Sequence, residues 1–139
     1  MTPSPVELLE SGRHSLAIVN NGNTYVFDGR GVADLFSIYK ETPGVLFGAS
    51  LADKVVGKGA AALMVLGGVV DVYALVISEP ALRFLQDAGV DVRFDKSVAM
   101  IINRSGTGPC PVESLCRECS TPQECLPMIE GFLHDMKVL

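Results

Sequence analysis

The four cysteines of this chain all lie in one short segment, at positions 110, 116, 119 and 125. Cys116 and Cys119 have the Cys-x-x-Cys spacing of metal-ligand and redox pairs, and on a helix they share one face. The turn expected at Ser120-Thr121-Pro122 would fold Cys125 back toward them. Cys110, Cys116, Cys119 and Cys125 are therefore candidate ligands for zinc or an iron–sulfur cluster. Structural zinc sites usually contain two Cys-x-x-Cys pairs and this chain has one, so a redox couple, a tail disulfide and free buried thiols are the alternatives.

Lys58 is the second residue whose type is unusual for its surroundings, because it is the only charged residue between positions 55 and 70. We expect one helix over residues 50–68, apolar or small on every side and therefore buried. Ser50 and Asp53 have the pattern of a helix N-cap, and a glycine pair ends the stretch. The uncharged run that follows Lys58 is too short to span a membrane. Since a cation near the start of a helix opposes the helix dipole, Lys58 should find an anion or reach solvent.

The remaining elements are predicted from turn signals and hydrophobic periodicity. In chain order they are a helix over 6–11, a hairpin of strands 14–19 and 24–27, a helix over 32–41, an extended piece over 45–48, a strand over 70–78, a helix from 79 that ends at 89, strands over 90–94 and 98–102, and a helical tail over 112–136 with a break at 120–122. The strand over 70–78 is nearly continuously apolar, which indicates cover on both faces. This order predicts an α/β layered domain with helices on both faces of a mixed sheet.

Composition narrows the class of protein. A chain of 139 residues predicts one domain, 1–139, of which the Cys-containing helical tail over 110–139 is a part. With 48% hydrophobic and 19% charged residues it can bury a core. The net charge of -5 argues against general nucleic-acid binding and against binding to a membrane surface. The first ten residues do not have the pattern of a signal peptide, so we expect a cytoplasmic protein.

Three motifs carry a resemblance to a known family. They are Asp-Lys-Val-Val-Gly-Lys-Gly-Ala-Ala at 53–61, Val-Tyr-Ala-Leu-Val-Ile-Ser-Glu-Pro-Ala-Leu at 72–82 and Ile-Asn-Arg-Ser-Gly-Thr-Gly-Pro-Cys-Pro-Val-Glu at 102–113. Together they resemble a bacterial and archaeal family, the domain-of-unknown-function family numbered 1893, over about residues 15–115. The resemblance implies a cytidine-deaminase-like fold, which is a three-layer α/β/α sandwich, and it implies no established activity.

Comparison with true deaminases argues against the usual zinc chemistry. Those enzymes place His-x-Glu or Cys-x-Glu at one helix start and Pro-Cys-x-x-Cys at the next. The first equivalent here, residues 56–60, has no His, Cys or Glu. The second keeps Pro109-Cys110 but has Glu113 where the second Cys would stand. A catalytic zinc needs about three protein ligands, so a zinc-dependent deaminase is not expected.

The implied fold brings both motifs to neighbouring helix N-termini, where free N–H groups favour anions. We therefore expect a pocket for a nucleotide-like or other anionic small molecule, in a binding or sensing protein. Its expected lining is Asp53, Lys58, Asn103, Thr107, Gly108, Cys110 and Glu113. The structural alternative is that Lys58 merely forms an ion pair with Asp53 or Glu113.

Two other functions stay open from the sequence. One is an enzyme of another reaction class that uses Cys110 as nucleophile and Lys58 as acid or electrostatic stabiliser. The other is a redox or iron–sulfur accessory protein that uses the four cysteines. A homodimer through apolar residues of segment 45–47 is a further hypothesis.

Overall fold

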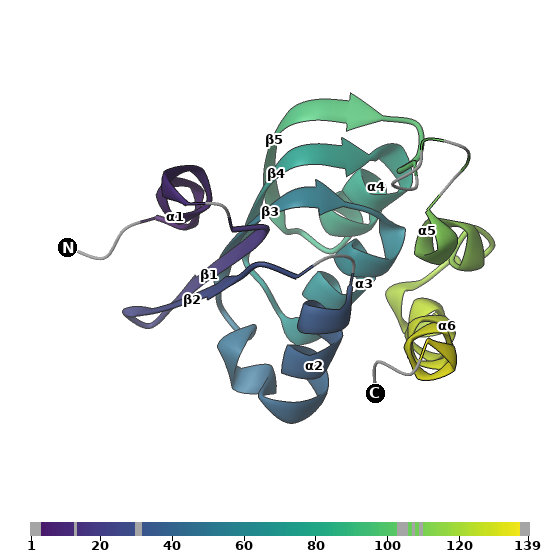
Figure 1. Ribbon diagram of the computed structural model, residues 1–139, viewed down its shortest axis with the longest axis horizontal. Coiled ribbons are helices and arrows are strands. Elements are labelled where there is room, and N and C mark those ends of the chain that lie inside the picture. The colour runs from purple at the N-terminus through teal and green to yellow at the C-terminus, as the bar shows by residue number, and fades with distance from the viewer. Residues whose placement is uncertain are drawn as a thin grey trace.

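The computed structural model describes residues 4–12, 14–29, 32–102, 106, 108 and 110–136 (Figure 1). The strands are β1 (Leu16–Asn20), β2 (Asn23–Phe27), β3 (Ser50–Val56), β4 (Asp71–Ser78) and β5 (Asp91–Val98). The helices are α1 (Pro5–Ser11), α2 (Ala33–Glu41), α3 (Lys58–Gly67), α4 (Glu79–Asp87), α5 (Pro111–Leu115) and α6 (Pro122–Asp135), with a 3-10 helix η1 (Pro43–Val45). No helix within the described ranges is both long and apolar enough to cross a membrane.

The strands form one mixed sheet in the order β2-β1-β3-β4-β5. β1 is antiparallel to both β2 and β3, whereas β3, β4 and β5 are parallel. Asn21 and Gly22, with φ of 52° and 83°, form the tight turn between β1 and β2 that the Asn-Gly pair predicts. The expected hairpin and the α/β class with a mixed sheet are confirmed.

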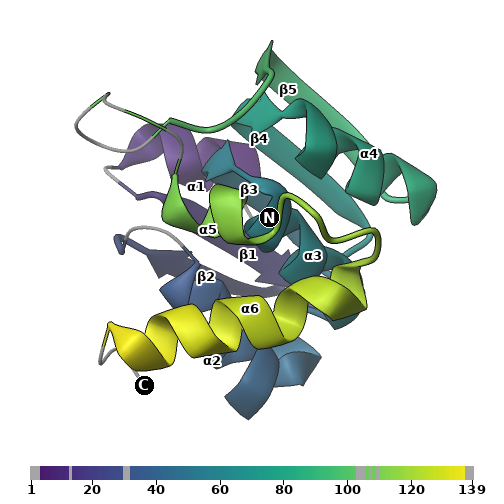
Figure 2. The same ribbon diagram turned by 90° about the vertical axis from the view of Figure 1, so that its right-hand side faces the viewer.

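The helices form layers on the two faces of the sheet (Figure 1). Of the described helices, α1 alone packs on one face, against β1 and β3. The steps from β3 to β4 and from β4 to β5 run in the same direction, so right-handed crossovers put α3 and α4 together on the other face. α5 and α6 lie outside α3 on that side (Figure 2). The architecture is therefore a three-layer arrangement whose main core surrounds α3.

The predicted helix over 50–68 is wrong in its first part. Residues 50–56 form the central strand β3, which pairs with β1 on one side and β4 on the other. Ser50 hydrogen bonds to the Asp71 carboxylate across the β3–β4 pair at 2.6 Å rather than capping a helix. Strand pairing on both sides satisfies the backbone of this segment, and Val55-Val56 suits a strand better than a helix. The helix starts at Lys58 instead and ends at Gly67, and Gly68, with a φ of 85°, forms the C-cap.

Two shorter predictions also need correction. Segment 45–48 is not extended: η1 ends at Val45 and turn residues follow. In the same segment Leu46 is fully buried and Phe47 is 75% exposed, so one side chain rather than an apolar stretch faces solvent. The strand expected over 90–94 is longer than predicted, because pairing with β4 carries β5 on to Val98. The separate strand expected over 98–102 is wrong: residues 99–101 are not in a strand, and Ile102 makes only an isolated bridge.

The start of α3 differs from the starts of α1, α4 and α6. Those three begin with a Ser or Thr side chain that accepts a backbone N–H, with proline in the first turn. α3 begins after Gly57 without a side-chain cap. A Cβ at Gly57 would collide with the Glu113 carboxyl, and a Cβ at Gly59 would collide with Val112. The two glycines thus allow α5 to pack directly on the first turn of α3.

We predict opposite effects of two Gly-to-Ala substitutions within helices. Gly131→Ala, at an exposed position of α6 with open space around it, should stabilise the protein by about 0.5–1 kcal/mol through helix propensity. Gly59→Ala gains the same propensity but forces Val112 and α5 outward, and should be destabilising by about 1–3 kcal/mol. Urea unfolding of both variants measures the difference, and equal effects would show that α5 is not tightly packed on α3.

Candidate functional site

A small cavity lies where the parallel strands end and α5 crosses the start of α3. Ligands in open α/β sheets bind outside the carboxyl ends of the strands, which is where this cavity lies. Its volume is about 90 Å³, and its lining residues are Lys58, Pro80, Ala99, Met100, Glu113, Ser114 and Arg117. Two of the predicted ligand-binding residues, Lys58 and Glu113, are therefore brought together at one cavity.

Glu113 is buried, with 7% of its surface exposed. Its Oε2 accepts a hydrogen bond from the Lys58 backbone N at 3.2 Å. The carboxyl group thus serves as the missing N-cap of α3, supplied from a different helix. Its Oε1 is also buried and has no hydrogen-bond partner among the described residues. Buried polar atoms are nearly always paired, so this oxygen is an acceptor available to a bound molecule.

The Lys58 side chain neither reaches solvent nor forms an ion pair within the described part of the chain, so the expectation for it is wrong. Its Nζ donates to the carbonyl oxygens of Arg117 and Cys119, at 3.1 and 2.5 Å. The ammonium also lies 5.2 Å from the centre of the Phe84 ring, in cation–π range. Backbone carbonyls and an aromatic face therefore take the place of a carboxylate, and Lys58 holds the loop after α5 against α3.

Asp53 is separate from this cavity. It lies half-buried on β3, opposite Leu16 and Ala74 in the sheet register. Its Oδ1 accepts a hydrogen bond from the Val55 backbone N at 3.4 Å. Burial raises the pKa of Asp53 to about 7, and the backbone hydrogen bonds from Val55 and Lys54 reduce the shift. The predicted role of Asp53 as a ligand-binding residue stays a prediction.

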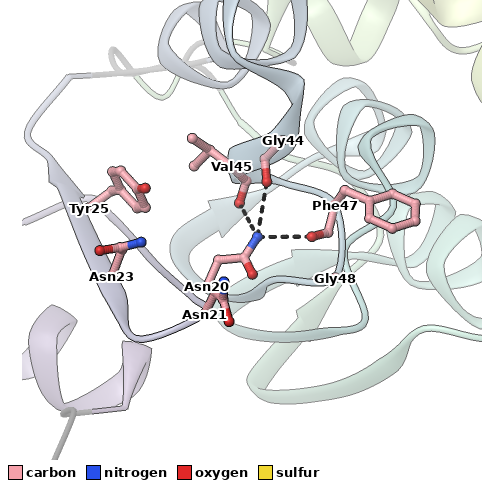
Figure 3. Close-up of a pocket in the computed structure, with 8 residues that line it drawn as sticks. All are labelled: Asn20, Asn21, Asn23, Tyr25, Gly44, Val45, Phe47 and Gly48. Atoms are coloured by element: carbon pink, nitrogen blue, oxygen red, sulfur yellow. Dashed lines mark hydrogen bonds between the residues drawn. The ribbon is translucent and has the colours of Figure 1, made fainter.

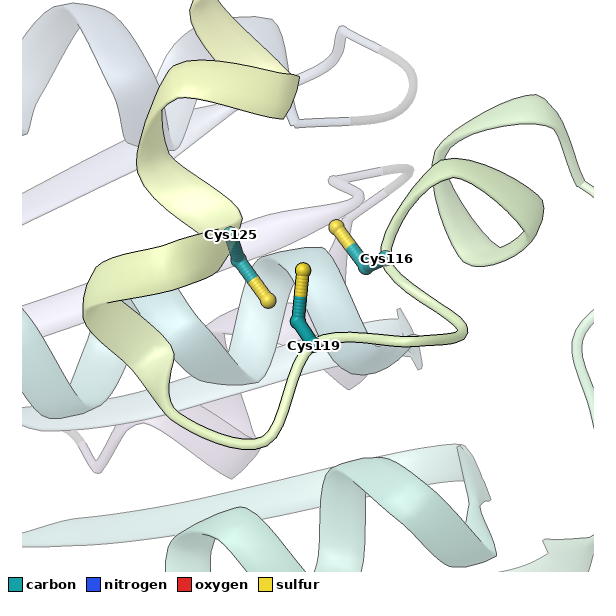
Figure 4. Close-up of side chains that lie close together, drawn as sticks. All are labelled: Cys116, Cys119 and Cys125. Carbon is teal, nitrogen blue, oxygen red and sulfur yellow. The ribbon is translucent and has the colours of Figure 1, made fainter.

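Three of the four cysteines converge (Figure 4). The Sγ atoms of Cys116, Cys119 and Cys125 all lie within 4.8 Å of one another, and all three residues are buried. They come from the end of α5, the following loop and the first turns of α6, and their sulfurs point toward one another. Burial raises the pKa of the Cys119 thiol, and the hydrogen bond with Cys116 is the main cause that raises the pKa of Cys125.

Cys110 is not part of this cluster. It is half-buried, precedes α5, and its backbone N donates to the Ile101 carbonyl at 2.8 Å. The cavity that Lys58 lines does not include Cys110, so the described geometry gives no support to the Cys110–Lys58 catalytic pair. Of the other predicted residues, Gly108 forms part of a bend. Asn103 and Thr107 lie outside the described residues.

A larger and more open hollow, of about 560 Å³, was missed from the sequence (Figure 3). Its lining residues are Asn20, Asn21, Asn23, Tyr25, Gly44, Val45, Phe47 and Gly48. The Nδ2 of Asn20 donates to the carbonyls of Gly44, Val45 and Phe47, at 2.9–3.1 Å. The run Asn20-Asn21-Gly22-Asn23 between the two predicted strands indicates a turn, and no local pattern indicates that Asn20 ties the hairpin to η1. Because that amide is satisfied within the fold, we assign the hollow a structural role.

The raised pKa of Asp53 predicts a pH-dependent stability. The pKa of Asp53 is about 7 in the folded protein and about 3.9 in the unfolded chain, so folding takes up a proton at pH values between these two. The stabilising contribution is complete below pH 4 and is lost as the pH rises through 7, with a slope of at most about 1.4 kcal/mol per pH unit. Asp53→Asn should therefore be more stable than the wild type at pH 8, with the gap closing toward pH 4. Asp91→Asn, at an exposed position, is the control; the same pH profile in all three proteins would contradict the assignment.

Comparison with known proteins agrees with this architecture. No curated protein matches the chain. A crystal structure of a DUF1893 family protein, TM1506 from Thermotoga maritima, is similar with a TM-score of 0.83 and 25% sequence identity, over 91% of this chain and 85% of that one. Residues 5–133 match the family TM1506, described as Domain of unknown function (DUF1893). The chain therefore belongs to the DUF1893 family.

Proposed function

We propose that this protein is a small-molecule binding or sensing module whose ligand donates an N–H group to Glu113. The observation that carries the proposal is the unpaired Oε1 of Glu113 beside the cavity. Leaving a buried acceptor without a donor costs about 1–3 kcal/mol. A ligand that donates a hydrogen bond to this oxygen offsets that cost. The site therefore favours molecules with a hydrogen-bond donor over molecules without one.

The contacts favour a donor over an anion. Two features of the described residues would attract an anion, namely the N-terminus of α3 and the Lys58 ammonium. The first is capped by the Glu113 carboxyl, and the second is bonded to two carbonyl oxygens. A phosphate would also lie next to a carboxyl group. The part of the ligand near Glu113 is therefore a neutral or cationic donor, such as the amino edge of a nucleobase.

The size of the cavity sets the size of the bound group. Drug-sized ligands usually occupy pockets of about 300–1,000 Å³, well above the 90 Å³ found here. The cavity thus takes one end of a molecule, and the remainder extends toward the strand ends. A nucleotide-like ligand fits this description, with its base edge at Glu113.

We also propose that the fold is cytidine-deaminase-like, without deaminase chemistry. What supports this is the contact between the two helix starts, where deaminases hold zinc between His or Cys ligands of two such helices. Here the contact joins Lys58 and Glu113. Neither motif brings the set of about three ligands that a catalytic zinc requires. A carboxyl group that caps a helix stands in the place of a metal centre. The cytoplasmic location and the homodimer stay predictions.

A substitution that exchanges one hydrogen-bond acceptor for a donor tests the binding site. In Glu113→Gln the amide oxygen keeps the hydrogen bond from Lys58 N, so the amide NH₂ takes the position of Oε1 and offers a donor instead of an acceptor. We expect nucleobases and nucleosides with amino groups to raise the melting temperature of the wild type. Glu113→Gln should weaken that binding roughly ten- to hundredfold, because a buried donor then faces the donor of the ligand and stays unpaired.

The control is Glu118→Gln, which makes the same change at an exposed position close in sequence and should bind as the wild type does. Inorganic phosphate serves as the anion probe. Stabilisation by phosphate alone, or unchanged nucleoside binding by Glu113→Gln, would overturn the proposal.

A further inference from the structure

Three buried thiols meet at a point that the proposed ligand site does not use (Figure 4). Cys116 and Cys125 are fully buried and Cys119 is 7% exposed. The three come from separate positions around the loop that joins α5 to α6, so their convergence is a property of the tertiary fold. Buried free cysteines often act as small apolar residues, and that role alone does not require three sulfurs within 4.8 Å of one another.

The backbone positions of the three cysteines are set by contacts that do not involve sulfur. A hydrogen bond from Cys119 N to Cys116 O, at 3.0 Å, closes a tight turn between these two residues. The Lys58 ammonium holds the Cys119 carbonyl from α3. At the start of α6, the Thr121 side chain accepts the Glu124 N–H at 3.3 Å, and this cap sets the position of Cys125 one turn into the helix. The thiol cluster is thus preorganised.

The separation of the sulfurs suits one metal ion. A tetrahedral zinc ion binds thiolates at about 2.3 Å, which places the sulfurs roughly 3.8 Å apart. Starting from separations of up to 4.8 Å, small side-chain rotations reach that arrangement. A disulfide would use two of the sulfurs and leave the third without a role. A cluster of several irons would require its thiolates to lie farther apart than a single ion does.

The charges also suit a divalent ion. Three thiolates and Zn²⁺ together carry one negative charge. The Lys58 ammonium, which donates to the carbonyl of Cys119 itself, supplies one positive charge beside them. Charges that leave water are tolerated when they are paired and hydrogen-bonded, and here the complex as a whole becomes neutral. This gives a reason for the Lys58 ammonium to lie where no carboxylate of the described residues forms an ion pair with it.

We propose that Cys116, Cys119 and Cys125 bind a single soft divalent ion of the zinc type, with Lys58 as the balancing charge. Three protein ligands leave the fourth position to a ligand from solution, since no fourth His, Cys, Asp or Glu within the described ranges joins the group. Cys110 is not a ligand. The ion ties α5 to α6, and through α5 it holds the wall of the Glu113 cavity.

Cobalt binding tests the site directly. The full chain is purified without oxygen, freed of metal with a chelator, and titrated with Co²⁺. We expect one equivalent to bind, with a sulfur-to-cobalt charge-transfer band and the strong visible absorption of a tetrahedral ion, and one equivalent of Zn²⁺ to displace it. Zn²⁺ alone should raise the melting temperature. Absence of binding or binding of more than one ion would overturn the proposal. So would a mass showing that two of the thiols already form a disulfide in the protein purified without oxygen.

Matched variants separate ligation from packing. Cys110→Ser should bind cobalt as the wild type does, whereas Cys119→Ala should lose the charge-transfer band. Cys119 is the least buried of the three, and alanine is tolerated in an apolar site, so this variant should stay folded. Circular dichroism confirms folding, and Cys125→Ala provides the same comparison from α6. An unchanged cobalt spectrum in folded Cys119→Ala would exclude the site.

Zinc affinity of a Lys58 variant tests whether this residue balances the charge of the ion. Lys58→Met removes the charge and keeps most of the side-chain volume, and it should weaken zinc binding about tenfold or more because the three-thiolate complex then keeps its negative charge. Lys96→Met, at an exposed position of β5, should bind zinc with wild-type affinity. Equal zinc affinities of the two variants would show that Lys58 does not balance the ion.

Discussion

The packing of α5 on the first turn of α3 is the contact on which the rest of the site depends. The first turn of a helix has N–H groups that need acceptors, and α3 has no side-chain cap of its own. Glu113 supplies one acceptor from a separate helix, at 3.2 Å from Lys58 N. This approach is allowed because Gly57 and Gly59 have no Cβ in the way. One contact therefore caps the central helix, positions α5 and creates the edge of the cavity.

Lys58 extends this arrangement to the C-terminal segment. Its backbone N–H meets Glu113, and its side chain reaches two carbonyls in the loop between α5 and α6. A buried ammonium has a high cost in free energy unless its hydrogen-bonding needs are met, and carbonyl oxygens meet them without the repulsion that a second carboxyl group would bring to the site. The same loop carries Cys116 and Cys119, so the candidate thiol site and the candidate ligand site share one organising residue.

The two hollows receive different assignments because the polar group in one has its hydrogen bonds within the fold and the polar group in the other does not. The larger one is lined by amides and carbonyls, and its central amide, Asn20, already donates to three carbonyls of the fold. The smaller one has a buried carboxyl oxygen with no donor in the described part of the chain. An unpaired buried acceptor is rare because it costs free energy, which is why the proposed ligand site is assigned to the smaller hollow. The size of a hollow carries no such information.

The sequence alone determined the elements whose signals are local. The Asn-Gly turn predicted the β1–β2 hairpin, the apolar run predicted β4, and the Thr121-Pro122 pair predicted the break before α6. Only the tertiary structure decided that residues 50–56 are a strand, because pairing with β1 and β4 outweighs a local pattern that resembles a helix start. It also decided which predicted site residues meet. Lys58 and Glu113 are 55 residues apart in sequence, and neither the contact between them nor the grouping of three cysteines without Cys110 has a local signal. Both follow from how α5 and α6 pack on α3, which depends on long-range burial rather than on spacing along the chain.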